Sequence, residues 1–269
     1  VVAVVGFAFF LAWELTEDHP VVDLSLFKGR NFWAGSTATA IAYGLFFANV
    51  VLMPLWLQQY MGYTATRSGM VMAQVGLLAI VLSPVVGKNL AKVDPRKFVT
   101  FSFLVFALVL WMRAQFSTQT DFDTILIPTF IQGIGMAFFF IPLVSITLSG
   151  IEPQRMAAAS GVSNFMRITA GAFGTSIATT LWEDRAKLHH VQLVEVLSSG
   201  RTVTADALTG MQNLGLTSPQ SLALINRWVD EQAFTLSAIE IFYASALMFL
   251  ALIPFVWITR PRRGGMGGK

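Results

Sequence analysis

Long apolar runs separated by short polar connections dominate this chain, and their lengths predict helices that cross a membrane. A helix rises about 1.5 Å per residue, so roughly 20 apolar residues span a hydrocarbon core of about 30 Å. In hydrocarbon every backbone polar group has to bond within its own segment, which is why we expect helices. Six stretches are long enough, at residues 32–57, 69–87, 96–116, 124–150, 156–182 and 236–259.

Several prolines fall within these stretches or near their ends, namely Pro54, Pro84, Pro128, Pro142 and Pro254. An interior proline costs about 3 kcal/mol in a soluble helix. Membrane helices tolerate it because neighbouring groups satisfy the freed backbone. Simple bending is one interpretation of these prolines, and hinges that move during function are the other.

The remaining segments complete the predicted layout of an all-α membrane protein. Residues 1–13 are apolar but too short to span, so we interpret them as the end of a preceding transmembrane span. The rest divides into a cytoplasmic connector at 14–31, five spans within 32–182, a long periplasmic loop with short helices at 183–235, a last span at 236–259 and a cytoplasmic tail at 260–269.

The long outer loop carries its own helical signals. Ser218 and Pro219 are typical of a helix N-cap and first turn, and apolar residues at helical spacing follow up to Gln232. Another short helix is predicted from Leu188, Val191 and Val194. This segment is either a surface cap or a docking surface for a partner.

The composition agrees with a membrane environment and excludes several kinds of chemistry. Hydrophobic residues make up 55% of the 269 and charged residues only 12%, against about 25% charged in soluble domains. There is no cysteine, which excludes disulfides, cysteine metal sites and thiol catalysis. The pair His189 and His190 lacks a third ligand at a telling spacing, so we predict a solvated helix face and no metal site.

Lysine and arginine fix the predicted orientation, because they concentrate in cytoplasmic connections. One alternate set of connections holds most of them: Lys28, Arg30, Lys88, Lys92, Arg96, Lys97, Arg155, Arg260, Arg262, Arg263 and Lys269. The short loops of the other set hold only Arg67 and Arg113. We therefore place the first set in the cytoplasm and the long loop outside.

Polar residues within the spans are the candidates for function, because a charge at the membrane centre costs about 2.5–3.5 kcal/mol on insertion scales. Arg167 lies near the middle of the fifth predicted span, and Asn164 lies one turn before it on the same helix face. The pair either forms a structural hydrogen-bond node between helices or belongs to a substrate or proton pathway.

Glu240 is the carboxylate that we place within a span, about one turn inside the outer end of the last one. In an apolar site it would suit reversible protonation. The alternative is an interfacial side chain that reaches outer water. The neutral candidates are Gln132, Asn49 and Tyr43, together with Gln74, and they are either partners in helix–helix hydrogen bonds or substrate ligands.

Enzymatic and nucleic-acid functions have no support in the sequence. No phosphate-binding loop, nucleophile elbow, zinc motif or kinase motif is present. The basic residues form short interfacial groups without interleaved aromatics, unlike those of nucleic-acid binders. We therefore predict neither catalysis, nor a cofactor, nor a metal, nor nucleic acid as a partner.

Several stretches across nearly the whole chain resemble the EmrB-type multidrug efflux transporters, a fourteen-span drug:proton antiporter group of the major facilitator superfamily. They include the segments at 13–16, 20–28, 62–66, 82–84, 94–101, 130–133, 146–150, 157–160 and 163–165. The resemblance implies the C-terminal six-helix bundle of such a transporter, with a missing N-terminal half. It also implies proton-driven export of hydrophobic drugs across the inner membrane of a Gram-negative bacterium, with an EmrA-like periplasmic adaptor and a TolC-like outer-membrane channel as partners.

Residues 87–97 resemble a degenerate copy of the superfamily's cytoplasmic-loop motif, represented by Gly87, Asp94, Arg96 and Lys97. Ala91 stands where the motif usually has an aspartate, so the motif is incomplete in this chain. Two other functions stay open from the residues themselves. One is a non-transporting membrane scaffold subunit that binds a partner through its outer loop, and the other is a carrier for another small molecule.

Overall fold

The computed structural model describes residues 5–6, 9, 24–90 and 92–260, and every regular element in that part of the chain is helical. The α-helices are α2 (Arg30–Gln59), α3 (Ala65–Asn89), α4 (Pro95–Arg113), α5 (Phe122–Ala137), α6 (Phe140–Thr147), α7 (Met156–Ser199), α8 (Arg201–Asn213) and α9 (Ser218–Trp257). Two short 3-10 turns, η1 (Leu24–Lys28) and η2 (Pro153–Arg155), precede α2 and α7. Most of the predicted span end at 1–13, most of the connector at 14–31, Ala91 and nearly all of the tail fall outside the described residues.

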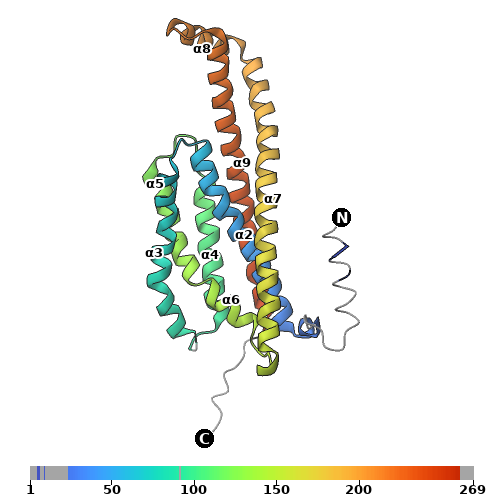
Figure 1. Cartoon of the computed structure of the whole chain (residues 1–269). Coiled ribbons are helices and arrows are strands. Elements are labelled where there is room, and N and C mark those ends of the chain that lie inside the picture. Colours follow the sequence, from blue (N-terminus) through green and yellow to red (C-terminus); the bar gives the residue numbers. More distant parts are fainter. Residues whose placement is uncertain (1–4, 7–8, 10–23, 91, 261–269) are drawn as a thin grey trace.

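The long helices run side by side in one bundle (Figure 1). Among the described residues, five segments are long and apolar enough to cross a membrane: Arg30–Gln59, Ala65–Asn89, Pro95–Arg113, Phe122–Thr147 and Ser218–Trp257. The all-α membrane fold predicted from the sequence is confirmed.

The remaining predicted span, at 156–182, lies in α7, which is not apolar enough to be one of these five segments. Its sequence mixes Asn164 and Arg167 with many Gly, Ala, Ser and Thr residues. It nevertheless packs along α2 and α9 in the same bundle (Figure 1). A helix of this composition needs neighbours other than lipid along part of its surface.

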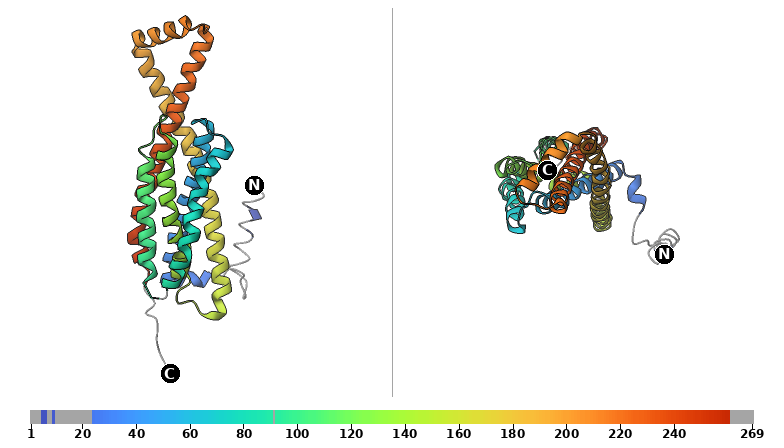
Figure 2. Two further views of the ribbon diagram at one scale, coloured as in Figure 1. Left: turned by 90° about the vertical axis from the view of Figure 1, so that its left-hand side faces the viewer. Right: turned by 90° about the horizontal axis from the view of Figure 1, so that it is seen from above.

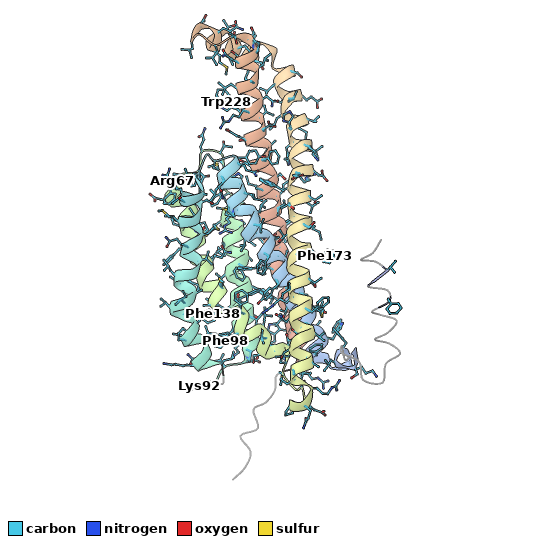
Figure 3. The ribbon with its side chains drawn as sticks, in the orientation of Figure 1. Arg67, Lys92, Phe98, Phe138, Phe173 and Trp228 are labelled. Atoms are coloured by element: carbon cyan, nitrogen blue, oxygen red, sulfur yellow. The ribbon has the colours of Figure 1, made fainter. Side chains whose placement is uncertain are left out.

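The basic connections predicted to share one side of the membrane lie at one end of the bundle. The α3–α4 turn with Lys92, the α6–α7 connection and the ends of the chain's long helices near Arg30 and Arg260 are all at the lower end in Figure 1. Figure 3 shows Lys92 at that end and Arg67 at the opposite one. The structure thus has one basic end and one end that carries the extension described below.

The fourth predicted span, at 124–150, is two helices and not one. The helix breaks at Phe138 and Phe139, between α5 and α6. Pro142 explains the position, because it has no N–H for the carbonyl of Phe138 four residues earlier and its ring crowds that carbonyl. The break leaves Phe139 fully buried, with ring contacts to Phe46 and Phe106 at centroid distances of 5.7 and 5.2 Å.

α2 and α7 approach each other backbone to backbone. A Cβ added at Gly174 would lie 2.3 Å from the carbonyl oxygen of Gly44, and one added at Gly44 would lie 3.0 Å from the carbonyl of Ala170. A Cβ added at Gly171 would lie 3.3 Å from a ring carbon of Phe47. Lipid tails are as apolar as the helices, so close van der Waals contact of this kind is what holds such helices together.

The predicted outer loop at 183–235 is instead a helical extension. α7 continues unbroken to Ser199, and α9 runs unbroken from Ser218 to Trp257. The helical stretches predicted near 188–194 and 218–232 are therefore parts of these long helices, and α8 is the separate short helix. Figure 2 shows the two helices crossing and then diverging, with α8 bridging their ends. A capping box between Thr217 and Gln220 starts α9, one residue before the predicted cap.

Glycines end the other two helices of the extension. Gly200 separates α7 from α8, and Gly215 follows α8 with a φ of +94°, a left-handed conformation that favours glycine. Near the base, Ser237 donates a 2.7 Å hydrogen bond to the carbonyl of Trp182, and the Trp182 indole donates to the carbonyl of Phe234 at 2.9 Å. These bonds fix α7 against α9 where both leave the bundle.

Candidate functional site

Arg167, Tyr43 and Asn164, predicted as separate candidates, meet between α7 and α2. The Arg167 guanidinium donates through Nη1 to the Tyr43 hydroxyl at 2.9 Å, and its Cζ lies 4.8 Å from the Tyr43 ring centroid. Its Nη2 donates to Asn164 Oδ1, one turn earlier on α7. Residues three apart share a helix face, which is why the sequence could pair these two.

Tyr43 is rigidly placed by the aromatic core. It is buried, and its ring contacts those of Phe139 and Phe140 at centroid distances of 5.4 and 5.2 Å. The helix break therefore carries the packing that positions the hydroxyl under Arg167. Both partners of the guanidinium are neutral, and among the described residues no carboxylate forms an ion pair with it.

A cavity of about 420 Å³ opens beside Arg167. α2, α7 and the α6 end of the broken helix line it, with residues Thr39, Val144, Leu148, Ser160, Gly161, Ser163, Asn164 and Arg167. Polar residues thus line this space beside the guanidinium, although the Thr39 hydroxyl is buried 3.3 Å from that of Thr147, and Val144 and Leu148 supply an apolar wall. A concave space with a few convergent polar groups of this kind is a candidate binding site.

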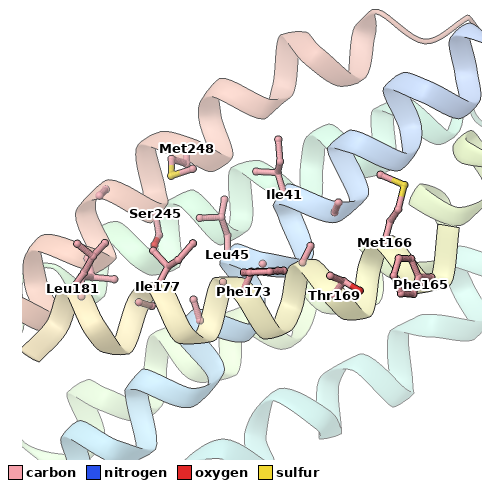
Figure 4. Close-up of a pocket in the computed structure, with 18 residues that line it drawn as sticks. Ile41, Leu45, Phe165, Met166, Thr169, Phe173, Ile177, Leu181, Ser245 and Met248 are labelled. Carbon is pink, nitrogen blue, oxygen red and sulfur yellow. The ribbon is translucent and has the colours of Figure 1, made fainter. Parts of the chain in front are cut away.

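A second, larger groove of about 620 Å³ lies between α2, α7 and α9 (Figure 4). Its walls are almost entirely apolar and include Ile41, Leu45, Phe173, Ile177 and Met248. Thr169 and Ser245 supply its hydroxyls. The polar cavity and this apolar groove share α2 and α7 as walls but open on different faces of the pair.

Gln132 belongs to a different cluster, around a residue that the sequence reasoning missed. Arg113, predicted as an outer-loop residue, ends α4 and is only 1% exposed. Its Nη2 donates to Gln132 Oε1 at 2.6 Å and to Thr129 Oγ1 at 3.3 Å, while its Nε has no partner among the described groups. Thr129 and Gln132 are three residues apart and so share one face of the next helix. That spacing is the feature of the sequence from which a polar cluster around Arg113 could have been predicted.

Asn49 stays within its own helix. Its Nδ2 donates to the carbonyl of Leu45 at 2.7 Å, its Oδ1 is buried without a partner among the described groups, and the side chain lines neither cavity. The structure therefore places Asn49 in helix packing and separates it from Arg167.

Of the two alternatives left open for Glu240, the structure favours the partly exposed side chain over the apolar site. Arg185 of the α7 extension bonds both of its oxygens, at 2.6 and 2.8 Å, and His189 Nε2 lies 3.0 Å away. The carboxylate's hydrogen bonds and charge raise the pKa of Arg185. Because this carboxylate is committed to a cation and its side chain is 38% exposed, it is a salt-bridge partner at the outer rim.

The histidine pair is also engaged, contrary to the solvated face that we predicted. His190 Nδ1 lies 2.8 Å from Asp230 Oδ1, next to the contact of His189 with Glu240. Both histidines therefore face α9. They belong to the same interhelix contact as Arg185.

The loop-motif residues cap and anchor α4. Asp94 is its N-cap and accepts a hydrogen bond from the Arg96 backbone N–H at 3.0 Å. The Arg96 side chain is buried and its Cζ lies 5.9 Å from the Trp257 ring centroid, at the end of α9. Lys97 follows in the first turn of α4, and Gly87 lies in the last turn of α3, where a Cβ would meet nothing within 4 Å. This end of the bundle thus ties α4 to α9.

Comparison with known proteins gives a consistent result. Residues 1–175 match the Major Facilitator Superfamily. The chain is 45% identical over 269 residues to the multidrug export protein EmrB of Escherichia coli K12, covering 100% of this chain and 52% of that protein. It is 41% identical over 265 residues to EmrB of Haemophilus influenzae, covering 98% and 52%, and 39% identical over 268 residues to the fatty acid resistance protein FarB of Neisseria gonorrhoeae, covering 100% and 53%. The chain spans about half the length of these curated relatives.

Proposed function

The chain belongs to the major facilitator superfamily, and from this premise we propose that it forms the C-terminal half of a proton-coupled multidrug efflux transporter for hydrophobic toxic compounds. The similarity to multidrug export proteins along the whole chain supports this proposal. The half-length match supports a second, N-terminal half as the other part of the machine.

The wall that α2 and α7 build around Arg167 is the observation that carries the proposal. α7 lies in the bundle, yet it presents hydroxyls, an amide and a cation to a 420 Å³ cavity at membrane depth. Intramembrane ionisable residues of this kind line pathways or site walls. The N-terminal half would supply the opposite wall, and rocking of the two halves would give alternating access.

The apolar groove supports a broad range of substrates. Its lining combines aliphatic side chains with Phe173 and with the flexible thioethers of Met166 and Met248. Such surfaces adapt to ligands of different shape and provide few fixed polar contacts. A hydrophobic drug is the solute that fits this chemistry.

The extension supports an external partner. Side chains that project into water there include Val191, Val196, Leu214 and Trp228, which are 63%, 66%, 82% and 51% exposed. Each of the three helices of the extension or its connections thus contributes exposed apolar side chains that a partner could cover. We propose that an EmrA-type periplasmic adaptor docks there and leads to a TolC-like outer-membrane channel, with the transporter in the inner membrane of a Gram-negative cell.

Reconstitution of the full-length protein into liposomes with a trapped pH-sensitive dye tests the proposal. We expect a hydrophobic drug to start proton flux that depends on the protein. Flux that is identical with and without the drug, from protein confirmed to be folded, would contradict drug:proton antiport.

The extension also favours a second function, a membrane scaffold that binds its partner without transport. Capture of the adaptor by full-length protein that shows no drug-dependent proton flux would support the scaffold. Capture together with flux would support the pump.

A further inference from the structure

Arg167 is a cation in the bundle part of α7 that the described part of the chain does not neutralise. It lies about 11 residues into α7, or roughly 17 Å along the helix, in a core about 30 Å thick. Its hydrogen bonds go to Tyr43 and Asn164, both neutral. The guanidinium stays protonated in proteins, so it cannot lose its charge to relieve the cost of this position.

Two other arginines, Arg185 and Arg113, show the contrast with Arg167. Arg185 has the Glu240 carboxylate at 2.6 Å, and Arg113 is sealed from any solute at 1% exposure. Of the described residues that line the polar cavity and the apolar groove, Arg167 is the only charged one. An anion that enters the cavity therefore finds one fixed positive charge.

The cavity also has the groups that an acidic head needs beside its charge. Ser160 and Ser163 line it together with Arg167, and their hydroxyls can donate to a carboxylate oxygen. Next to it on α7, Phe165 and Ile168 project outward, 64% and 62% exposed. A polar pocket with one cation beside an apolar strip matches an amphiphile with an acidic head and a hydrophobic body.

Given the export function proposed above, we propose that Arg167 selects substrates with a carboxylate or similar acidic head, which binds in the cavity while the apolar body lies along α7. Charge-assisted hydrogen bonds to a guanidinium are about twice as strong as neutral ones and can be bidentate. Arg167 is thus a specificity-determining residue.

The test uses the full-length transporter in detergent and three probes with one alkyl chain: dodecanoate, dodecanol and dodecyltrimethylammonium. Each probe competes with a bound fluorescent dye. We expect Arg167→Gln to weaken dodecanoate binding by about 10–100-fold and dodecanol binding by less than about threefold, because only the acid loses a charge-assisted bond. Arg167→Lys keeps the charge without the bidentate fork and should fall between the two.

Arg227→Gln is the matched control, because it removes a positive charge from an exposed site on the extension, 73% exposed, without touching the cavity. If Arg167→Gln misfolds, Gly161→Leu replaces it. A Cβ at Gly161 meets nothing within 4 Å, and a larger side chain would fill the cavity and weaken dodecanoate binding.

Equal loss of all three probes in Arg167→Gln would overturn the inference and point to a structural role for Arg167 in the cavity wall. Unchanged dodecanoate binding in a folded Arg167→Gln or Gly161→Leu variant would overturn it as well. Failure of the export function itself would look different, because the unsubstituted protein would then transport no hydrophobic dye at all.

Discussion

The two parts of helix α7, one in the bundle and one in the extension, are held by different interactions. In the bundle it meets α2 through glycines whose backbones touch, at Gly44 and Gly174. In the extension it meets α9 through charged groups, with Arg185 on Glu240 and His190 on Asp230. Between helices in lipid, association depends mainly on close van der Waals packing. Between helices in water, ion pairs can form, but solvent screens them and each stabilises the structure little. Substitutions at the contacts of α7 in the bundle should therefore lower the stability of the protein more than substitutions at its contacts in the extension.

Substitution at the glycine crossing should have the largest effect. In Gly174→Ala the new methyl would lie 2.3 Å from the Gly44 carbonyl, so one backbone has to move. Overpacking of this kind costs about 1–3 kcal/mol, and we expect the upper end because the obstacle is backbone. Thermal unfolding of the full-length protein in detergent measures the loss.

Gly161→Ala is its control, since the new methyl there meets nothing within 4 Å. We expect no loss of stability at that position. Equal melting temperatures for the two variants would show that the crossing is not a tight contact.

The two buried amides should respond in opposite directions. Gln132→Leu removes the 2.6 Å acceptor of the buried Arg113 and leaves that charge short of a partner, so we expect a loss of about 2 kcal/mol. Asn49→Leu removes an Oδ1 that has no partner among the described groups, and we expect little change or a gain. Chemical unfolding of both variants compares them, and a larger loss at position 49 would reverse our assignment.

Tyr60 lies at the boundary between the two environments and should give a pH-dependent effect. Burial, with added repulsion from Asp230 and Glu183, raises its pKa from 10.0 to about 12. The unfolded chain therefore loses this proton first, and the stability contribution is complete below pH 10 and is lost as the pH rises toward 12. Because the side chain is partly exposed, we expect about 1 kcal/mol.

Tyr60→Phe should remove this alkaline loss while it keeps the ring stack on Phe234 at 4.2 Å. Melting temperatures from neutral to strongly alkaline pH measure it. An unchanged alkaline limb would assign the loss to other groups.

The rim ion pair should give the smallest effect. Glu240→Gln breaks the contact with Arg185, but the two side chains are 38% and 44% exposed, so we expect at most about 1 kcal/mol, reduced further by salt. Melting at low and high ionic strength tests this. A loss of stability as large as that of Gly174→Ala would mean that the contacts of the extension stabilise the protein as much as those of the bundle.

The sequence predicted where lipid surrounds the chain better than where helices end. Apolar length placed the span at 32–57 within α2 and that at 69–87 within α3. The same signal ended a span at residue 182, although α7 continues to Ser199, because polarity reports the membrane boundary and says nothing of helix continuity. The break at Phe138 depended on the carbonyl opposite Pro142, and the sequence alone predicted bending or a hinge at the prolines without locating a break.

The candidate site was predictable only where its residues share one helix. Arg167 and Asn164 are three apart, so their common face follows from the helical repeat. The Tyr43 partner is 124 residues away, and Arg185 and Glu240 are 55 apart, so these pairings depend on which helices cross. Arg113 was missed because a basic residue at the end of an apolar run is the usual sign of a loop.

Unbroken helices that pass from the bundle into the extension make a pair of levers. From the contact at Gly174 to the end of α7 at Ser199 is about 37 Å at 1.5 Å per residue. A tilt of about 10° at the crossing would sweep the tip by roughly 6 Å. A partner bound to the extension would therefore be displaced when the helices of the bundle tilt. The continuous helices contain no flexible joint between bundle and extension that could absorb the movement.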